Sequence, residues 1–194
     1  MTTDARFPEL VSLACHDIRT PLATVSGFAG TLLRMGSLEP QLERYVGLIQ
    51  TAAGQIAELT DQLSVAARAA RGPLDASPTE HDSLELAREA AARVGEERAA
   101  ASGTGAAVLV DRELVVRGLA SLTLAAVRHG GLERAELSVA GSDVELTPVT
   151  EAAPVVLSEE LRDLGAASAR AVIEALGGSL ERRAHSVVVR LPAA

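Results

Sequence analysis

Two apolar stripes in the first third of the 194-residue chain constrain its fold more than any other feature. Residues in each stripe alternate spacings of four and three, which is the spacing of a coiled-coil-like helical seam. The first stripe is Val11, Cys15, Ile18, Leu22, Val25, Ala29 and Leu32, and the second is Tyr45, Ile49, Ala52, Ile56, Leu59 and Leu63. Turn-forming residues from 35 to 40 separate them, so the sequence predicts a helical hairpin.

The width of these stripes also predicts an assembly. One hairpin cannot bury both stripes against itself, whereas two hairpins bury them as a four-helix bundle. We therefore expect residues 1–71 to form a dimerisation hairpin and the chain to be an obligate homodimer.

Composition excludes several classes of function. The net charge is -8 and the pI is near 5.0, which argues against binding to nucleic acid or to an anionic membrane. Cys15 is the single cysteine, so neither an internal disulfide nor a cysteine metal cluster is possible. No apolar run approaches the ~18 residues of a membrane span, and the N-terminus lacks a signal-peptide pattern. We expect a soluble, cytoplasmic protein with no membrane partner.

The segment from Ser12 to Leu22 contains the candidate catalytic residues. A proline inside a helix removes a hydrogen bond and costs about 3 kcal/mol, so Pro21 indicates a functional constraint. His16 follows a seam position and is expected to point outward, with Thr20 one turn further along the same face. Asp17 can accept a proton-bearing ring nitrogen, which would leave the other nitrogen of His16 as a nucleophile. The alternative is a solvated surface histidine.

Small residues continue the face of His16 along the first helix. They are Ala23, Gly27 and Gly30. Glycine inside a helix costs about 1 kcal/mol relative to alanine. The row therefore predicts a flat track on which a helix of a partner protein can approach closely. Neutral drift in an exposed helix rich in alanine and glycine explains it equally well.

The rest of the chain, residues 72–194, reads as an α/β domain after a linker and first edge strand at 71–78. We expect helices at 83–101, 112–129 and 158–176, and strands at 106–110, 134–140, 143–149, 179–183 and 186–191. Helices on one face of a mixed sheet make an α/β sandwich. The fold class expected for the whole chain is therefore α+β, a helical hairpin followed by an α/β sandwich.

Several of these motifs resemble those of sensor histidine kinases. His16 to Leu22 reads His-Asp-Ile-Arg-Thr-Pro-Leu, which is similar to the H-box of that family. The second domain resembles the family's catalytic ATP-binding domain. That likeness rests on Asp111-Arg112-Glu113, Val127-Arg128-His129-Gly130, Leu164-Gly165, Ala169-Arg170, Glu174-Ala175-Leu176-Gly177-Gly178-Ser179-Leu180 and Leu191-Pro192.

The departures from that family bear most on function. Ser121 and Ala125 stand where the family has two asparagines that hold magnesium and phosphates. Residues 147–154 lack the aspartate and glycines with which that family recognises adenine. The lid segment that closes over the phosphates in that family is nearly absent. Asp163 would add negative charge where phosphates need exposed N–H groups. The resemblance therefore implies a degenerate ATPase-like domain that holds no ATP, no metal and no other cofactor.

Together these features imply a histidine phosphotransferase in a two-component phosphorelay. It is similar to dimeric phosphotransferases built from a kinase-like hairpin and a degenerate ATPase domain. His16 would relay a phosphoryl group between aspartates of response-regulator receiver domains. Asp17 would orient the ring, Arg19 would screen phosphate charge and Thr20 would position water. Magnesium would be held by the receiver.

Two other classes of function remain open. One is a divergent or split histidine kinase whose His16 is phosphorylated in trans, for which a hybrid or sensor kinase would be the partner. The other is a non-catalytic pseudokinase that binds a receiver or a kinase. The intact H-box argues against the second.

Overall fold

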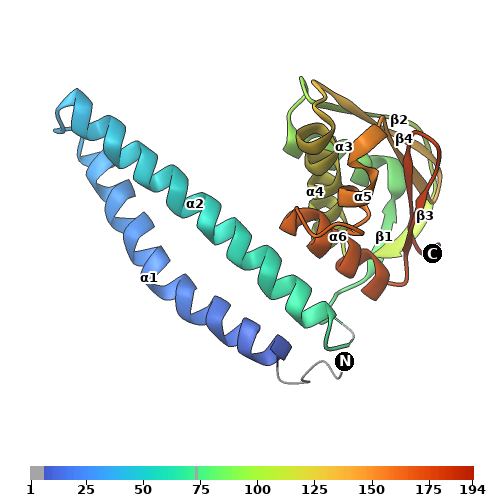
Figure 1. Cartoon of the computed structure of the whole chain (residues 1–194), viewed down its shortest axis with the longest axis horizontal. Helices are drawn as coiled ribbons and strands as arrows, with labels where there is room; N and C mark the ends of the chain where they lie inside the picture. The colour runs from blue at the N-terminus through green and yellow to red at the C-terminus, as the bar shows by residue number, and fades with distance from the viewer. Residues whose placement is uncertain (1–6, 73) are drawn as a thin grey trace. The chain divides into compact units, whose positions relative to one another are not determined.

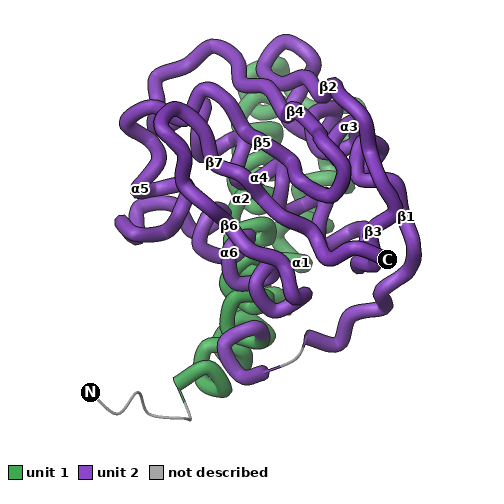
Figure 2. The backbone as a smooth tube through the Cα atoms, turned by 90° about the vertical axis from the view of Figure 1, so that its right-hand side faces the viewer, with its two compact units in different colours: residues 1–68 green, residues 69–194 purple. Residues whose placement is uncertain are grey.

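The protein is described here from a computed structural model, which covers residues 7–72 and 74–194. It divides into two compact units, residues 1–68 and 69–194 (Figure 2). Residues 1–6 of the expected hairpin domain and Pro73 of the expected linker lie outside the described residues. None of the described helices is long and apolar enough to cross a bilayer.

The first unit is an antiparallel hairpin of two long helices (Figure 1). Helix α1 spans Phe7–Met35 and helix α2 spans Pro40–Ala69. Gly36 follows α1 with a φ of +64°, the left-handed conformation that commonly ends a helix. Pro40 begins α2, where its missing N–H is not needed. The helical hairpin predicted from the two stripes is therefore confirmed.

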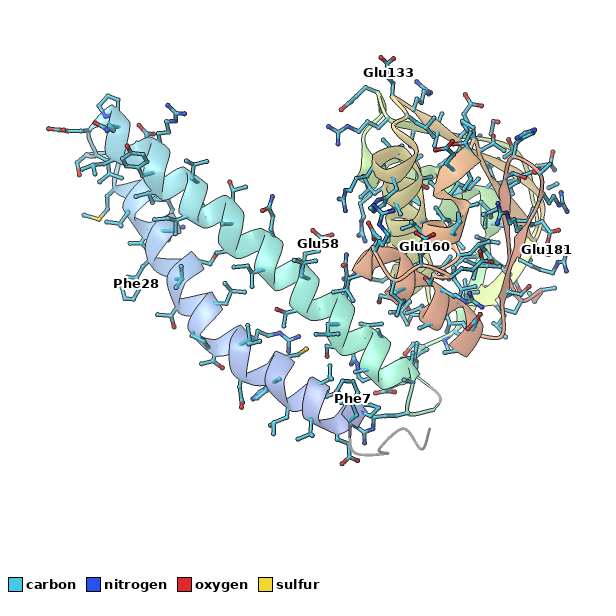
Figure 3. The ribbon with its side chains drawn as sticks, in the orientation of Figure 1. Phe7, Phe28, Glu58, Glu133, Glu160 and Glu181 are labelled. Carbon is cyan, nitrogen blue, oxygen red and sulfur yellow. The ribbon has the colours of Figure 1, made fainter. Side chains whose placement is uncertain are left out.

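The predicted stripes divide between two environments. Cys15 and Ala29 are buried between the helices, whereas Ile18 and Val25 of the same stripe stay 46% exposed. On α2 the stripe residues Tyr45, Ile49, Ile56, Leu59 and Leu63 are between 40% and 51% exposed. Phe28, which points away from α2 in Figure 3, is 68% exposed. One hairpin thus leaves a continuous apolar face uncovered, as a dimeric bundle requires.

Replacing Ile56 with aspartate is expected to dissociate the dimer and leave the helices formed. Burying an unpaired carboxylate in a bundle core is strongly unfavourable, whereas the same carboxylate in a single hairpin stays hydrated. Light scattering after size exclusion should change from dimer mass to monomer mass, with unchanged helical circular dichroism. Gln55→Asp, at an exposed polar neighbour, should remain dimeric. A well-folded monomer of the unmodified chain would contradict the four-helix arrangement.

The second unit contains two sheets. Strands β1 (Thr79–Asp82) and β3 (Ala107–Val110) form an antiparallel pair. The larger sheet has the order β2-β4-β5-β7-β6, in which β2 and β4 are parallel and all other neighbours antiparallel. Its strands are β2 (Ala99–Gly105), β4 (Ala135–Gly141), β5 (Asp143–Thr147), β6 (Ser179–Arg182) and β7 (Val187–Arg190).

Helices cover one face of this larger sheet (Figure 1). They are α3 (Ser83–Val94), α4 (Arg112–Gly130), α5 (Ala153–Val156) and α6 (Leu164–Ala175), with a short 3₁₀ turn at Thr150–Ala152. Aspartates cap the three longer helices, because their side chains accept backbone N–H groups of the first turn. The core between the layers is aliphatic and centres on Leu86, Leu119, Leu122, Leu137, Leu146 and Ile173. The predicted α/β sandwich is confirmed.

Two predicted helix boundaries are wrong. The helix expected over 83–101 ends at Val94, because Gly95 takes a φ of +111° that residues with a Cβ rarely adopt. Ala99–Gly105 is strand β2 instead, since pairing with β4 overrides the helix propensity of its alanines. The helix expected over 158–176 begins at Leu164, where the side chain of Asp163 caps it.

Candidate functional site

His16 lies on the exposed surface of α1. It shares one side of the helix with Ala23 and Gly30, because residues seven apart stack after two turns. Helix α1 continues through Pro21, which has no N–H to give to the carbonyl oxygen of Asp17. The residue next to His16 therefore keeps a free backbone acceptor on the surface. The outward placement predicted for His16 matches its exposure.

Arg19, which follows His16 by three residues on α1, forms an ion pair with the second helix. Its Nη2 donates to Oδ1 of Asp61 on α2 at 2.7 Å, and both side chains are about half exposed, at 52% and 46%. Sequence reasoning assigned Arg19 to screening phosphate charge and missed Asp61. No pattern in the sequence marks Asp61, because its partner on α1 lies 42 residues away along the chain.

Small residues recur at several positions along both helices of the hairpin. A Cβ at Gly30 would lie 3.2 Å from Nε2 of Gln50 on α2, which places this end of the α1 row against α2. A Cβ at Gly27, Gly47 or Gly54 would have no atom within 4 Å. Of the predicted track, Ala23 and Gly27 are exposed, whereas Gly30 is buried against α2. Sequence reasoning missed Gly47 and Gly54, which are open positions on α2.

The other predicted catalytic residues are close in sequence to His16 but are not hydrogen-bonded to it. Within residues 7–72 and 74–194, no hydrogen bond joins His16 to Asp17. The backbone carbonyl of Thr20 accepts the hydroxyl of Thr24 at 3.3 Å, and Thr20 itself is exposed. The roles expected for Asp17 and Thr20 remain predictions. Among the described residues, no three histidine, cysteine or acidic side chains are grouped to hold a metal.

In the second unit, the region expected to hold nucleotide phosphates contains a carboxylate of the chain itself. Asp163 caps α6 by accepting the N–H of Ala166 at 3.0 Å. Its Oδ2 also lies 3.1 Å from Nη1 of Arg128 and 3.0 Å from Nε2 of His129. The Asp163 side chain is only 7% exposed. His129 is thus one of three partners of a nearly buried carboxylate.

The neighbouring positions are filled by apolar atoms. Ala125 is completely buried in the core and offers no oxygen ligand, while Ser121 is half-buried. Val149 and Val156, in and beside the segment where an adenine-reading loop was expected, are also completely buried. Arg170 donates to the carbonyl of Leu157 and holds the end of α5 in place. Magnesium requires oxygen ligands, and this lining supplies few of them.

Comparison with known proteins places these features in a family context. Residues 9–72 match the family described as the His Kinase A (phospho-acceptor) domain. Domains of this family function in two-component signalling, and in general they dimerise. Comparison with the curated proteins found no match.

Solved structures extend the likeness to the whole chain. Full-length ShkA in complex with AMPPNP is similar with a TM-score of 0.68 and 20% identity, over 96% of this chain and 47% of that chain. The histidine kinase AdeS of Acinetobacter baumannii is similar with a TM-score of 0.55 and 17% identity, over 91% of this chain and 97% of that one. This chain thus spans about half the length of ShkA.

At these identities the structural likeness shows the fold, and the family match covers the hairpin that carries His16. Residues 9–72 thus match the His Kinase A (phospho-acceptor) domain, and the chain as a whole has the fold of histidine kinases, a helical hairpin followed by a domain of the ATPase type.

Proposed function

We propose that the protein is a histidine phosphotransferase, which relays phosphoryl groups between receiver domains through His16 and does not phosphorylate itself from ATP. The observation that supports this most is the combination of a phospho-acceptor hairpin with a second unit in which Asp163 binds Arg128, His129 and the N–H of Ala166, in the region where the family resemblance implies phosphates.

The chemistry of the relay needs little from this chain besides an exposed nucleophile. A neutral ring nitrogen of His16 attacks the phosphorus of an aspartyl phosphate, so that a P–N bond forms as the P–O bond to the aspartate breaks. The aspartate leaves as a carboxylate, and the ring keeps its proton on the other nitrogen. Asp17 would orient that nitrogen, and Thr20 would hold water when the phosphoryl group is lost by hydrolysis. Magnesium would come with the receiver and its acidic pocket.

The open positions of small residues support a helical partner. Ala23 and Gly27 on α1, with Gly47 and Gly54 on α2, let another helix approach the backbone along the hairpin that carries His16. Close helix approach across small residues allows many contacts without long side chains in between. A receiver domain seated there would bring its aspartate to the exposed ring.

The test is incubation with receiver domains from the same organism, each phosphorylated with acetyl phosphate. Transfer to this chain should give a label that is stable to base and labile to acid, as expected for phosphohistidine. Tight binding of a receiver without transfer would instead favour the pseudokinase function.

Mg-ATP is expected not to bind. Calorimetry should give no heat of binding, because Asp163 repels phosphates electrostatically and Ala125 supplies no ligand to magnesium. Micromolar affinity, or self-labelling from ATP, would favour the divergent kinase that the likeness to histidine kinases also allows.

Replacing Asp163 with alanine is expected to destabilise the second unit by about 2 kcal/mol, because a helix cap is lost and a partly buried His129 loses its partner. Asp82→Ala, which removes a cap without ion pairs, should cost only about 1 kcal/mol. Urea unfolding of both variants measures the difference. Equal losses would mean that Arg128 and His129 contribute nothing beyond the cap.

A further inference from the structure

We propose that Asp61 is a positioning residue, which holds the Arg19 guanidinium against α2 and so keeps it away from a phosphoryl group on His16. The inference rests on the proposed function and deepens it, because it assigns a way in which the hairpin sets the free energy of phosphohistidine.

The contact that supports this is the short ion pair between the two helices. Nη2 of Arg19 lies 2.7 Å from Oδ1 of Asp61, within the range of charge-assisted hydrogen bonds. Arg19 follows His16 by three residues, and residues three apart are neighbours on a helix surface. The cation that could reach a group on His16 is therefore bound, in this structure, to a carboxylate on the other helix.

If Arg19 were free, His16 would accept a phosphoryl group more readily and donate it less readily. Arginine is the side chain best suited to bind a phosphoryl group, because its planar fork matches two phosphate oxygens. Such a pair would lower the free energy of phosphohistidine and make onward transfer less favourable. A relay that transfers in both directions needs donor and acceptor of similar free energy. Asp61 competes with the phosphoryl group for Arg19 and so preserves that balance.

Position on α2 makes Asp61 suitable for this role. It lies on α2 within 2.7 Å of Arg19, which follows His16 by three residues on α1. Glu58, one turn earlier, provides a control of the same charge. It points away from α1 in Figure 3, and its Oε1 accepts from Nε2 of Gln62 at 3.5 Å rather than from an arginine.

The experiment uses potassium phosphoramidate, a small phosphoryl donor that needs no partner protein. The nitrogen of His16 displaces ammonia from phosphorus, so the ratio of phosphorylated to free chain at fixed phosphoramidate and ammonia reports the free energy of phosphohistidine. Phosphorus NMR measures this ratio and identifies the phosphohistidine. The variants are Asp61→Asn, Asp61→Glu, Glu58→Gln and the double variant Arg19→Ala with Asp61→Asn.

Asp61→Asn is expected to raise the ratio about fivefold, the effect of one partly exposed ion pair. Asp61→Glu keeps the carboxylate and should give the ratio of the unmodified chain. Glu58→Gln should leave that ratio unchanged. The double variant should also return to it, since the effect acts through Arg19. A label on His16 with the same ratio in Asp61→Asn, or equal rises in Asp61→Asn and Glu58→Gln, would overturn the role of Asp61 and leave the relay standing. A chain that takes no label from phosphoramidate or from any receiver would overturn both.

Discussion

His16→Ala is expected to abolish all phosphoryl transfer from the cognate phosphorylated receiver. Under the proposed function the ring supplies the attacking nitrogen, and alanine has no nucleophile to take its place. The dimer should persist, because His16 is exposed and lies outside the seam. Autoradiography of the transfer reaction, together with light scattering on the same sample, measures both results.

His185→Ala is the control for this substitution. His185 is likewise exposed, but it lies between β6 and β7 of the second unit, where its backbone carbonyl accepts the N–H of Val149. Its side chain can be removed without loss of that bond, so transfer should continue at the unmodified rate. If His16→Ala still accepts a label from the receiver, the phosphotransferase proposal is wrong.

Gly103→Ala is expected to cause the largest loss of stability, about 4 kcal/mol, in the second unit. Gly103 lies in edge strand β2 with a φ of +118°, and a Cβ there would sit 2.1 Å from the carbonyl oxygen of Val139 on β4. Backbone atoms cannot rotate away as a flexible side chain can, so β2 would have to separate from β4.

Hydrogen-exchange mass spectrometry should reveal this loss as faster exchange in strands and helices of residues 79–194, with α1 and α2 unchanged. Gly141→Ala is the matched control, because Gly141 has a φ of +64° but no atom within 4 Å of a Cβ. It should cost only about 1 kcal/mol, the price of the left-handed conformation alone. Equal effects of the two substitutions would show that the close approach to Val139 is unimportant.

Sequence periodicity was sufficient for the hairpin, because a seam spaced four and three over seven positions has few other solutions. It failed at Ala99–Gly105, where the alanines favour a helix and only the pairing with β4, more than thirty residues away, makes a strand. It also failed at residues 158–162, which were expected to begin a helix and instead precede its cap, Asp163. Local preference cannot report the long-range pairing of β2 with β4.

The candidate site could be predicted only where its residues lie close together along one helix. His16 and the row of Ala23, Gly27 and Gly30 follow from spacing along one helix. Asp61 and the partners of Asp163 lie 42 and about 35 residues away from the side chains they bind, and no pattern along the chain marks such pairs. Their identification required the fold.

The carboxylate of Asp163 has a consequence for how the cell could address this protein. A bound nucleotide comes and goes with the supply of ATP and ADP, but an anion that belongs to the chain cannot dissociate, be exchanged or be diluted. The carboxylate that Arg128 and His129 contact belongs to the same chain, so its local concentration does not change with that of any nucleotide. Under the proposed function, phosphoryl transfer through His16 therefore does not depend on the ratio of ATP to ADP in the cell. Compounds that compete with ATP for kinases would find no bound nucleotide to displace.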